Sequence, residues 1–459
     1  MPREIITIQV GQCGNQLAMR FWDLALREYK QYHDKDVFTD ALSSFFTNLD
    51  IHEDVRKELG IGDSISCLKA RSVVVDMEEG VINNMRRSEI GSLFEDNQII
   101  SSISGAGNNW AHGHFEYGRQ YGREIMDTVR RKVEECHSPQ TFILLHSMGG
   151  GTGSGLGTYI LSQIADEYPN IFKFNNVVFP EDDVVTGPYN SVLAMSKLSE
   201  HSDCILPVDN KALRNILDFL EQEKAKKATN HSDILENGNE KTQAFAKMNN
   251  IIAHLLNNLT CSMRFDGMLN VDLNEITMNL VPYPGMNYLV SSVSPLFSIV
   301  EKAKVTSSLD QLFDEAIDSR FQLMHCSPLE HSYLACGLLL RGGARISDIT
   351  MNIDRIKPKM KMAYWNNEGF KIGLCNEPPI GMDSSLLCLA NNSCIKTPLI
   401  SLRNKFNRLY KRKANVHHYT EYMDIGEFDS AEASLSEVIR KYSECEVRKD
   451  EIKRVKPVF

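Results

Sequence analysis

The sequence has no long apolar run, no signal-peptide pattern and no excess of positive charge. Its apolar stretches, such as residues 288–300, are short and interrupted by polar residues, whereas a membrane-spanning helix needs about 20 apolar residues in a row. Residues 3–4 are charged and lead straight into an apolar stretch, which is not how a signal peptide begins. We therefore expect a soluble, intracellular protein with no membrane insertion.

Cysteine usage and net charge exclude two further classes of protein. The 11 cysteines include no CxxC pair, which favours reduced thiols over a disulfide framework or a zinc site. The chain carries 50 basic and 60 acidic residues, a formal charge of −10. A protein that coats nucleic acid would need a basic excess, so we expect no nucleic-acid partner.

The first half of the chain alternates short apolar runs with helical patterns. We expect strands at residues 4–10, 72–76, 141–146 and 176–179, and helices at residues 17–29 and 156–166. Repeated strand–loop–helix units predict an α/β fold in which a parallel sheet is covered by helices on both faces. In such folds ligands bind at the carboxyl ends of the strands.

The second half is more mixed. Residues 220–247 are polar and charged, which predicts an exposed, mobile loop. Residues 245–263 place apolar side chains at helical spacing and predict a long central helix. Strands and helices mix after this helix, and from about residue 400 the pattern is helical with alternating charge.

A glycine-rich segment between a predicted strand and a predicted helix is the strongest motif. It reads SMGGGTGSG over residues 147–155. Successive glycines let backbone amides converge, and the helix N-terminus adds partial positive charge, so the segment suits a phosphate. It is neither a Walker A loop nor a clean dinucleotide fingerprint. A glycine-rich turn is often only a tight turn, but the hydroxyls of Ser147, Thr152 and Ser154 favour a phosphate site.

Three weaker motifs support that interpretation. GQCGNQ, residues 11–16, follows the first strand, and Gln12 and Cys13 could contact a phosphate, although the turn could be purely structural. Asp76 and Glu78 follow the second strand and fit a magnesium ion held largely through waters, or simply a solvated turn. Asn108, in GAGNNW, could donate to a phosphate.

Taken in order along the whole chain, these motifs resemble the tubulin family. The motifs are GQCGNQ, GAGNNWAHGH, GGGTGSG, PYN at 188–190, VDN at 208–210, LNVDLNE followed by NLVPYP, and LYKRKANVHHY. Within the family, the epsilon type is most similar over FWDLALRE at 21–28, ALSSFF at 41–46, SCLKAR at 66–71, DMEEGV at 76–81 and EDDVVT at 181–186. The delta and gamma types are less similar over these stretches.

The resemblance implies a domain organisation and a nucleotide site. It implies a GTP-binding domain over residues 1–215, a linker loop, central helix and mixed α/β intermediate domain over 216–397, and a C-terminal helical hairpin within 398–459. The implied cofactors are GTP or GDP and Mg²⁺. The implied phosphate contacts are Gln12, Cys13, Asn108, Ser147, Gly151, Thr152 and Gly153, with Asp76 and Glu78 at the metal. Asp183 and Asn210 would approach the ribose and base, Phe245 would stack on the base, and Asn249 would hydrogen-bond the guanine edge.

Two residues depart from the pattern of alpha- and beta-tubulins. Gly187 stands where they carry a glutamate that reaches the ribose, and Phe245 stands where they have a stacked tyrosine. Stacking survives the loss of the hydroxyl, whereas the missing carboxylate is expected to weaken affinity. Because the phosphate loops are complete, we still expect GTP binding.

Asp272 and Glu275 lie three residues apart at the start of a predicted helix and therefore share a face. Such a pair is most often solvated or interacts with the helix dipole. The resemblance implies another role, because in alpha-tubulin this segment reaches the nucleotide site of the neighbouring subunit and activates hydrolysis. We therefore expect Asp272 and Glu275 to be catalytic towards the neighbour's nucleotide, so that GTP hydrolysis depends on assembly.

The leading interpretation is a structural, GTP-binding cytoskeletal protein: an epsilon-type member acting in microtubule assembly at centrioles, basal bodies or the centrosome. Its expected partners are other tubulins in longitudinal contact and proteins of the centriole or basal body. The alternatives are a conventional, gamma-like or delta-like tubulin and, from another class, a nucleotide-dependent enzyme acting on a small molecule. Against that enzyme, the sequence offers no nucleophile–base pair.

The charge of residues 445–459 separates this chain from conventional lattice tubulins. The segment holds five basic and three acidic side chains, whereas lattice tubulins have glutamate-rich tails that attract basic partners. A basic segment would repel those partners and contact acidic surfaces instead. We therefore expect a specialised cytoskeletal location rather than bulk incorporation into microtubules.

Overall fold

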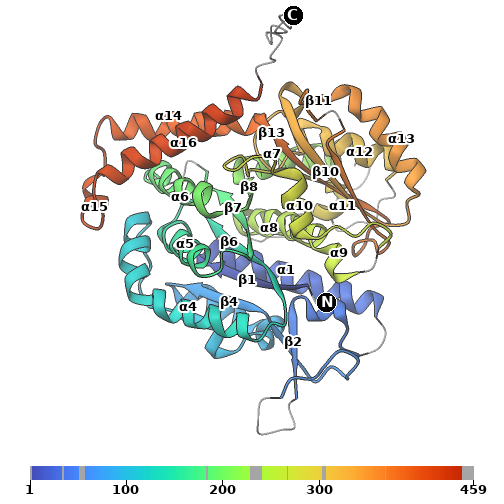
Figure 1. The fold of residues 1–459 in the computed structure, drawn as a ribbon, viewed down its shortest axis with the longest axis horizontal. Coiled ribbons are helices and arrows are strands. Elements are labelled where there is room, and N and C mark those ends of the chain that lie inside the picture. Colours follow the sequence, from blue (N-terminus) through green and yellow to red (C-terminus); the bar gives the residue numbers. More distant parts are fainter. Residues whose placement is uncertain are drawn as a thin grey trace, which may run out of the picture.

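The computed structural model shows two large sheets surrounded by helices, with a helical hairpin along one side (Figure 1). It describes residues 3–33, 36–50, 57–181, 184–227, 240–265, 267–301, 307–366 and 368–446. Within these ranges, no helix is both long enough and apolar enough to cross a membrane.

The N-terminal part is built on a six-stranded parallel sheet in the order β5-β4-β1-β6-β7-β8. Its strands are β1 (Glu4–Val10), β4 (Ser72–Asp76), β5 (Ile99–Ser101), β6 (Pro139–Ser147), β7 (Phe172–Phe179) and β8 (Cys204–Asp209). A small hairpin pairs β2 (Phe46–Leu49) with β3 (Cys67–Ala70). Every strand expected from the sequence is present, and the prediction of a parallel α/β sheet is confirmed.

Side chains alternate between the two faces of this sheet, and each face has its own core. From β1, Ile5 packs on one face while Ile6 and Ile8 pack on the other. Burying both faces requires apolar residues at consecutive positions, which explains the run EIITIQV. The first face is covered by α1 (Gly11–Tyr32), α3 (Glu79–Arg87), α7 (Asn210–Lys227) and α8 (Glu240–Leu259), and the second by α4 (Gly118–Glu134), α5 (Gly157–Glu167) and α6 (Gly187–His201).

The second sheet is mixed, as predicted. β13 (Ser385–Asn392) runs antiparallel to β9 (Val290–Ser294) and β10 (Ser332–Arg341), whereas β11 (Lys361–Met362) and β12 (Phe370–Cys375) run parallel to β10. Its helices are α9 (Cys261–Arg264), α10 (Leu273–Leu280), α11 (Leu296–Glu301), α12 (Leu309–Ile317) and α13 (Ile346–Ile356). The long helix α8 contacts α1 as well as β9 and β13, so it lies between the two sheets. The prediction of a central helix is confirmed.

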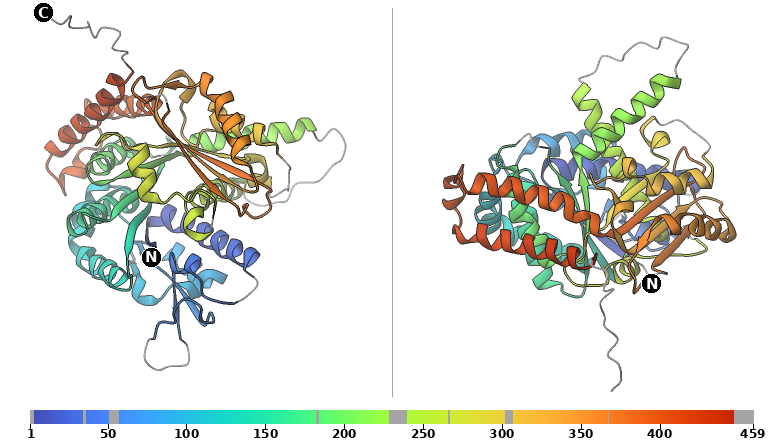
Figure 2. Two further views of the ribbon diagram at one scale, coloured as in Figure 1. Left: turned by 45° about the vertical axis from the view of Figure 1, so that its right-hand side comes forward. Right: turned by 90° about the horizontal axis from the view of Figure 1, so that it is seen from above.

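The last described residues form the predicted helical hairpin. It consists of α14 (Lys396–Tyr410), the short α15 (His417–Thr420) and α16 (Gly426–Glu444). α14 and α16 run side by side and both pack against α6 (Figure 2). The buried ring of Tyr189 on α6 lies 5.5 Å from Phe406 and 5.1 Å from Phe428, centroid to centroid. This aromatic cluster holds the hairpin against the first sheet's helical layer.

Short elements complete the described chain. They are α2 (Asp40–Ser43), the 3₁₀ turns η1 (Glu89–Leu93), η2 (Asp96–Gln98), η5 (Ser319–Phe321), η6 (Pro328–Glu330), η7 (Lys357–Lys359) and η8 (Ser393–Ile395), and the π-helical turns η3 (His112–Tyr117) and η4 (Thr152–Leu156).

Two local predictions are wrong in part. Residues 220–247 are not one loop, because α7 continues to Lys227 and α8 already begins at Glu240; residues 228–239 lie outside the described residues. Lys, Glu, Gln and Ala are good helix formers, so a polar composition did not by itself exclude a helix here. GQCGNQ is not a turn that precedes a helix, because α1 begins at Gly11 itself.

A buried ionic cluster joins the two halves of the molecule. The carboxylate of Glu28 on α1 is fully buried and accepts hydrogen bonds from Arg264 of α9, at 2.9 Å, and Arg341 of β10, at 3.0 Å. Burial alone would raise the pKa of Glu28, but the two guanidinium groups outweigh burial and hold that pKa below its ordinary value. The cluster therefore keeps Glu28 ionised inside the protein.

Candidate functional site

The residues predicted to bind phosphate and metal lie at the carboxyl edge of the first sheet. β5, β4, β1 and β6 are neighbours in that order, so the loops that follow them are neighbours too. At or after the carboxyl ends of these strands lie, in the same order, Asn108, Glu78, Gln12 and Ser147. Four segments that are far apart in the sequence are thus brought together along one edge.

The first residue of α1 lies against the glycine-rich segment that follows β6. Gly11 has a φ of +74°, a conformation that glycine adopts without steric cost. A Cβ on Gly11 would lie 3.1 Å from the backbone nitrogen of Gly153. A Cβ on Gly153 would in turn lie 3.0 Å from both the backbone oxygen and the Oγ of Ser147. Because these segments pack so closely, they would bind an anion mainly through backbone N–H groups.

Residues 105–109 close the other side of the glycine-rich loop. A Cβ on Gly151 would lie 2.6 Å from the Cβ of Ala106 and 2.8 Å from the backbone nitrogen of Asn109. Asn108 is exposed and has a φ of +55°, which among non-glycine residues is mainly adopted by Asn and Asp. The position of a Cβ on Gly150 is 3.7 Å from the Oδ1 of Asn108, so this amide faces the glycine-rich loop.

The remaining predicted phosphate contacts surround the same loops. Gln12 is exposed and Cys13 is partly buried in the first turn of α1. Burial raises the pKa of the Cys13 thiol to about 11, so this side chain is a protonated donor at neutral pH and not a reactive thiolate. Thr152 begins η4, which continues directly into α5, so the second half of the glycine-rich segment is itself a helix N-terminus.

The carboxylate of Asp76 is buried and incompletely hydrogen-bonded. Asp76 is the last residue of β4, and 2% of its surface is exposed. Its Oδ1 accepts a hydrogen bond from the backbone N–H of Glu78 at 3.3 Å. Its Oδ2 is buried and has no hydrogen-bond partner among the described residues. Burial raises the pKa of Asp76 to about 6. A buried, unsatisfied carboxylate oxygen is costly, and a cation would relieve that cost. Together with the exposed Glu78, Asp76 fits a Mg²⁺ ion that keeps several waters.

The residues predicted at the ribose and base are less completely placed. Asn210 begins α7 directly after β8, at the same sheet edge, and is half-buried. Asp183 lies outside the described residues. Gly187 begins α6, and a Cβ there would meet no atom closer than 3.8 Å. Packing therefore does not require a glycine at position 187.

Phe245 and Asn249 lie four residues apart in the first half of α8 and therefore share a face. The ring of Phe245 is 44% exposed, and Asn249 is half-buried. On a helix whose other apolar residues are packed between two sheets, an aromatic ring with that much free surface is suited to stack on a planar ligand.

Sequence reasoning missed Asn190, which organises the site without lying in any of its loops. This residue of α6 is fully buried, and its amide joins the backbone of the 105–109 loop to the backbone of the glycine-rich loop. The PYN motif drew attention to the segment only as part of the family resemblance. A periodicity argument could not have found it, because a buried asparagine on a helix interrupts an apolar face.

Asp272 and Glu275 are not brought together with the other predicted site residues. α10 packs against β10 and β12 of the second sheet. Asp272 is the N-cap of α10, and its side chain accepts from the backbone N–H of Glu275 at 2.8 Å. The carboxylate of Glu275 forms an ion pair with Lys371 of β12. The hydrogen bond between Asp272 and the backbone N–H of Glu275 is an interaction at the helix terminus, which the sequence offered as an alternative to a catalytic role for Asp272.

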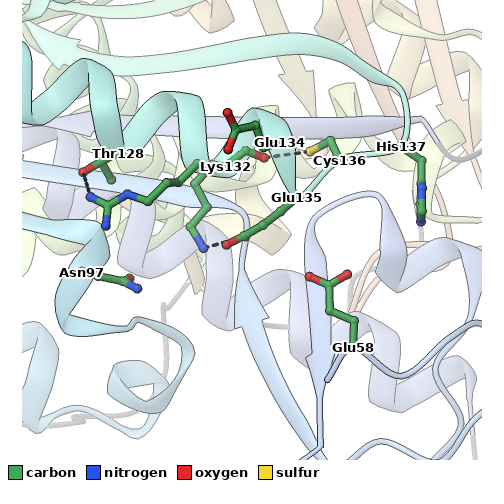
Figure 3. Close-up of a pocket in the computed structure, with 9 residues that line it drawn as sticks. Glu58, Asn97, Thr128, Lys132, Glu134, Glu135, Cys136 and His137 are labelled. Atoms are coloured by element: carbon green, nitrogen blue, oxygen red, sulfur yellow. Dashed lines mark hydrogen bonds and ion pairs between the residues drawn. The ribbon is translucent and has the colours of Figure 1, made fainter. Parts of the chain in front are cut away.

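A hollow of about 420 Å³ lies elsewhere, near the end of α4 (Figure 3). Its wall includes the ion pair between Lys132 and Glu135, 2.8 Å apart, and the thiol of Cys136, which donates to the backbone oxygen of Lys132. Burial raises the pKa of Cys136 to about 12, so it is not a nucleophile at neutral pH. His137 leads into the amino end of β6, so this hollow lies at the sheet edge opposite the predicted nucleotide site.

Comparison with known families identifies the class of protein. Residues 4–218 match the GTPase domain of the Tubulin/FtsZ family. Residues 284–404 match the tubulin C-terminal domain. The chain belongs to the tubulin family and is a GTP-binding cytoskeletal protein.

Individual relatives cover nearly the whole chain. The chain is 45% identical to the tubulin epsilon chain of Mus musculus over 97% of its own length and 96% of that protein. The same figures hold for the tubulin epsilon chain of Homo sapiens. Identity to the tubulin alpha-1 chain of Saccharomyces cerevisiae is 33%, over 96% of this chain and 97% of that protein. The resemblance to the tubulin family, and within it to the epsilon type, is confirmed.

Proposed function

We propose that this chain is an epsilon-type tubulin that binds GTP or GDP with Mg²⁺ and acts in microtubule assembly at centrioles or basal bodies. The observation that carries the nucleotide part is the convergence of the segments that follow β5, β4, β1 and β6, where a Cβ on Gly11 would lie 3.1 Å from the backbone nitrogen of Gly153. Such a cradle of glycines in front of a helix N-terminus is the arrangement that binds phosphates.

Each part of the nucleotide has its proposed residues. The phosphates are bound by Gln12, Cys13, Asn108, Ser147, Gly151, Thr152 and Gly153. Asp183 and Asn210 reach the ribose and base, Phe245 stacks on the base, and Asn249 recognises guanine. Asp76 and Glu78 hold the Mg²⁺ ion through water, and the ion supplies positive charge next to the phosphate oxygens. The orphaned Oδ2 of Asp76 supports this assignment.

The proposed catalytic group acts between subunits. α8 has 20 residues and therefore spans about 30 Å, and α10 follows in the chain after the end of α8 that is opposite Phe245 and Asn249. Glu275 is partly exposed on α10 and accompanied by the exposed side chain of Met278. This placement suits contact with a second tubulin chain, whose bound GTP Glu275 would serve by orienting a water molecule. Asp272 assists by capping α10 and so fixing the backbone at Glu275.

The proposed cellular role follows from the relatives. Identity to two epsilon chains exceeds identity to an alpha chain by 12 percentage points, 45% against 33%, at nearly equal coverage. Gly187 also separates this chain from the alpha and beta types, which carry a glutamate at this position. Proposed partners are other tubulin chains in longitudinal contact and proteins of the centriole or basal body, and the proposed location is the cytoplasmic cytoskeleton at these organelles.

The nucleotide proposal is tested by extracting and identifying the nucleotide of the purified full chain and by measuring its preference for GTP over ATP. Asn249→Ala should weaken GTP binding by about 1–3 kcal/mol, because the guanine edge loses a paired amide. Asn250→Ala is the matched control, since the neighbouring Asn250 donates to Ile299 and not towards the ligand face. Nucleotide-free protein that shows no thermal shift with GTP, or equal affinity for GTP and ATP, would contradict the proposal.

The location proposal is tested with a tagged copy in cells that form centrioles. We expect discrete foci at centrioles or basal bodies. Uniform incorporation along cytoplasmic microtubules would instead favour a conventional tubulin.

The alternative from another class is a nucleotide-dependent enzyme that acts on a small molecule. Such an enzyme would reach its full turnover rate as a dilute monomer, and this rate can be measured on the same purified protein.

A further inference from the structure

Two cysteine thiols, those of Cys326 and Cys394, are in contact although the residues lie 68 positions apart in the sequence. Cys326 precedes η6, and Cys394 lies within η8, directly before the first helix of the C-terminal hairpin. The Sγ of Cys394 donates to the Sγ of Cys326 at 3.3 Å. Neither residue is among those assigned above to the nucleotide, to magnesium or to hydrolysis.

Hydrogen bonds hold the two cysteine-bearing segments against each other. The side-chain amide of Asn392 donates to the backbone oxygen of Pro328 at 3.1 Å, and the backbone N–H of Ser332 donates to the Oγ of Ser393 at 3.0 Å. Because these contacts fix the two backbones close to the thiols, a disulfide needs a movement of the sulfur atoms of only about 1 Å.

The two thiols differ in their access to solvent. Cys326 is partly exposed, whereas Cys394 is fully buried. The hydrogen bond to Cys326 and burial raise the pKa of the Cys394 thiol, so this thiol keeps its proton at neutral pH. A dissolved oxidant therefore reaches Cys326 first, and Cys394 is available only to its neighbour. An accessible cysteine with a second thiol beside it is the arrangement of redox-sensitive cysteine pairs.

Other cysteines of the chain lack one of these two features. Cys336 and Cys388 lie 3.7 Å apart, sulfur to sulfur, but both are buried in the second sheet. Cys445 is partly exposed, but its Sγ contacts the Sδ of Met286 and not a second thiol. These residues serve below as controls for accessibility and for pairing.

We propose that Cys326 and Cys394 form a redox modification site that a hydroperoxide converts into an intrachain disulfide. The thiolate of Cys326 attacks a peroxide oxygen and the O–O bond breaks, which leaves a sulfenic acid on Cys326; the released hydroxide takes up the proton that Cys326 lost. The Sγ of Cys394 then attacks the sulfur of Cys326, and the sulfenic hydroxyl leaves as water with the proton of Cys394. Two thiols are oxidised to one disulfide, and hydrogen peroxide is reduced to two molecules of water.

The disulfide strengthens the attachment of the C-terminal hairpin. Glu446, which follows α16, accepts a hydrogen bond from the Oγ of Ser393 at 2.7 Å and lies 2.7 Å from the Nδ1 of His331. Lys396, the first residue of α14, forms an ion pair with the same carboxylate. These partners of Glu446 come from the two segments that carry the thiols. A covalent bond between the segments therefore fixes the site that holds the end of the hairpin.

The test uses the purified, reduced full chain, treated in its native state with hydrogen peroxide. Remaining thiols are alkylated, and the chain is digested without reduction and analysed by mass spectrometry. We expect the loss of two of the 11 free thiols and a cross-linked peptide pair that contains Cys326 and Cys394. The midpoint of thermal unfolding should rise on oxidation, and a dithiol reductant should restore both thiols and the original midpoint.

Two variants distinguish the disulfide from oxidation of a single cysteine. Cys394→Ala should stop the reaction at the sulfenic acid of Cys326, which dimedone traps, and should abolish the rise in the unfolding midpoint. Cys326→Ser, at a partly exposed position, should leave Cys394 reduced. Cys445→Ser is the matched control, because Cys445 is also partly exposed but contacts Met286, and should change neither the cross-link nor the shift.

Three results would overturn the proposal. The first is a wild-type chain in which Cys326 is oxidised or cross-linked elsewhere while Cys394 stays reduced. The second is a cross-link between the buried Cys336 and Cys388 that forms as fast, because oxidation would then follow unfolding and not exposure in the native fold. The third is no reaction of Cys326 at a peroxide concentration that oxidises Cys445. None of these measurements depends on bound nucleotide or on a partner tubulin.

Discussion

The Nδ2 of Asn190 lies 2.8 Å from the backbone oxygen of Asn108, and the same nitrogen lies 2.9 Å from the backbone oxygen of Gly149. The Oδ1 of Asn190 accepts from the backbone N–H of Trp110, at 3.0 Å, and from the hydroxyl of Tyr419, at 2.6 Å. One buried amide therefore fixes two predicted phosphate loops relative to each other and to the C-terminal hairpin.

Asn190→Ala should destabilise the chain and weaken GTP binding although Asn190 is not expected to touch the nucleotide. Removing the amide leaves several buried polar groups without partners, at about 1–3 kcal/mol for each group that water cannot reach. We expect a loss of about 2–4 kcal/mol in the free energy of unfolding, measured in urea, and at least tenfold weaker GTP binding, measured by calorimetry. Asn404→Ala, at an exposed position of α14, is the control and should change neither quantity. Unchanged nucleotide affinity in Asn190→Ala would show that the loops hold their positions without it.

The parts of the fold predicted from the sequence are those that depend on local patterns. β1 and β4 were predicted to the residue, because continuous β-branched runs between glycine or polar segments are typical of strands buried on both faces. The start of α1 was not, because the two glycines of GQCGNQ favour a turn, whereas α1 begins at Gly11 itself. Long-range hydrogen bonds such as those of Asn190 leave no periodic signal at all.

Three buried histidines predict how stability depends on pH. Burial lowers the pKa of His114, His146 and His254 to about 4 each. In the unfolded chain a histidine protonates near pH 6.5, so stability is fully present above that pH and is lost as the pH falls towards 4. At pH 5 each histidine should cost about 2 kcal/mol.

The measurement is urea unfolding at pH 7.5 and pH 5. His146→Gln should reduce the difference in the free energy of unfolding between pH 7.5 and pH 5 by about 2 kcal/mol. His417→Gln, at an exposed position, is the control and should leave this difference unchanged. If His146→Gln shows the full wild-type loss at pH 5, this histidine is not the source of the acid sensitivity.

The buried carboxylate of Glu28 should be far more important for stability than a surface carboxylate of the same helix. Glu28→Gln leaves Arg264 and Arg341 without a counter-charge inside the protein, and breaking a buried ion pair in this way costs about 3–5 kcal/mol. Asp23→Asn is the matched control, because Asp23 pairs with Arg27 on the exposed side of α1, 2.7 Å away, and such pairs contribute at most about 1 kcal/mol. Equal unfolding midpoints for the two variants would mean that water or neighbouring groups compensate the buried arginines.

The last prediction concerns the ion pair between Glu275 and Lys371. The Nζ of Lys371 lies 2.6 Å from the Oε2 of Glu275, with 29% and 44% of the two side chains exposed. In the isolated chain one oxygen of the carboxylate is therefore paired with Lys371, and under the proposed mechanism Glu275 would exchange this partner for a water molecule at the nucleotide of a neighbouring subunit. Orienting that water and completing the charge environment is most of what phosphoryl transfer needs from the protein. Hydrolysis should consequently be slow in dilute protein and rise when a partner tubulin is added.

Glu275→Gln should lower this assembly-stimulated GTP hydrolysis about 100-fold or more, while the affinity of the chain for its own GTP stays unchanged. An exposed ion pair contributes at most about 1 kcal/mol to stability, so the variant is expected to fold. Glu368→Gln is the matched control, because Glu368 forms a similar exposed pair with Lys357, 2.5 Å away, outside α10. Phosphate release would be measured against protein concentration for all three proteins. An identical specific rate in dilute and assembled wild type, or full activity in assembled Glu275→Gln, would remove Glu275 from the mechanism and return it to the role of a partner for Lys371.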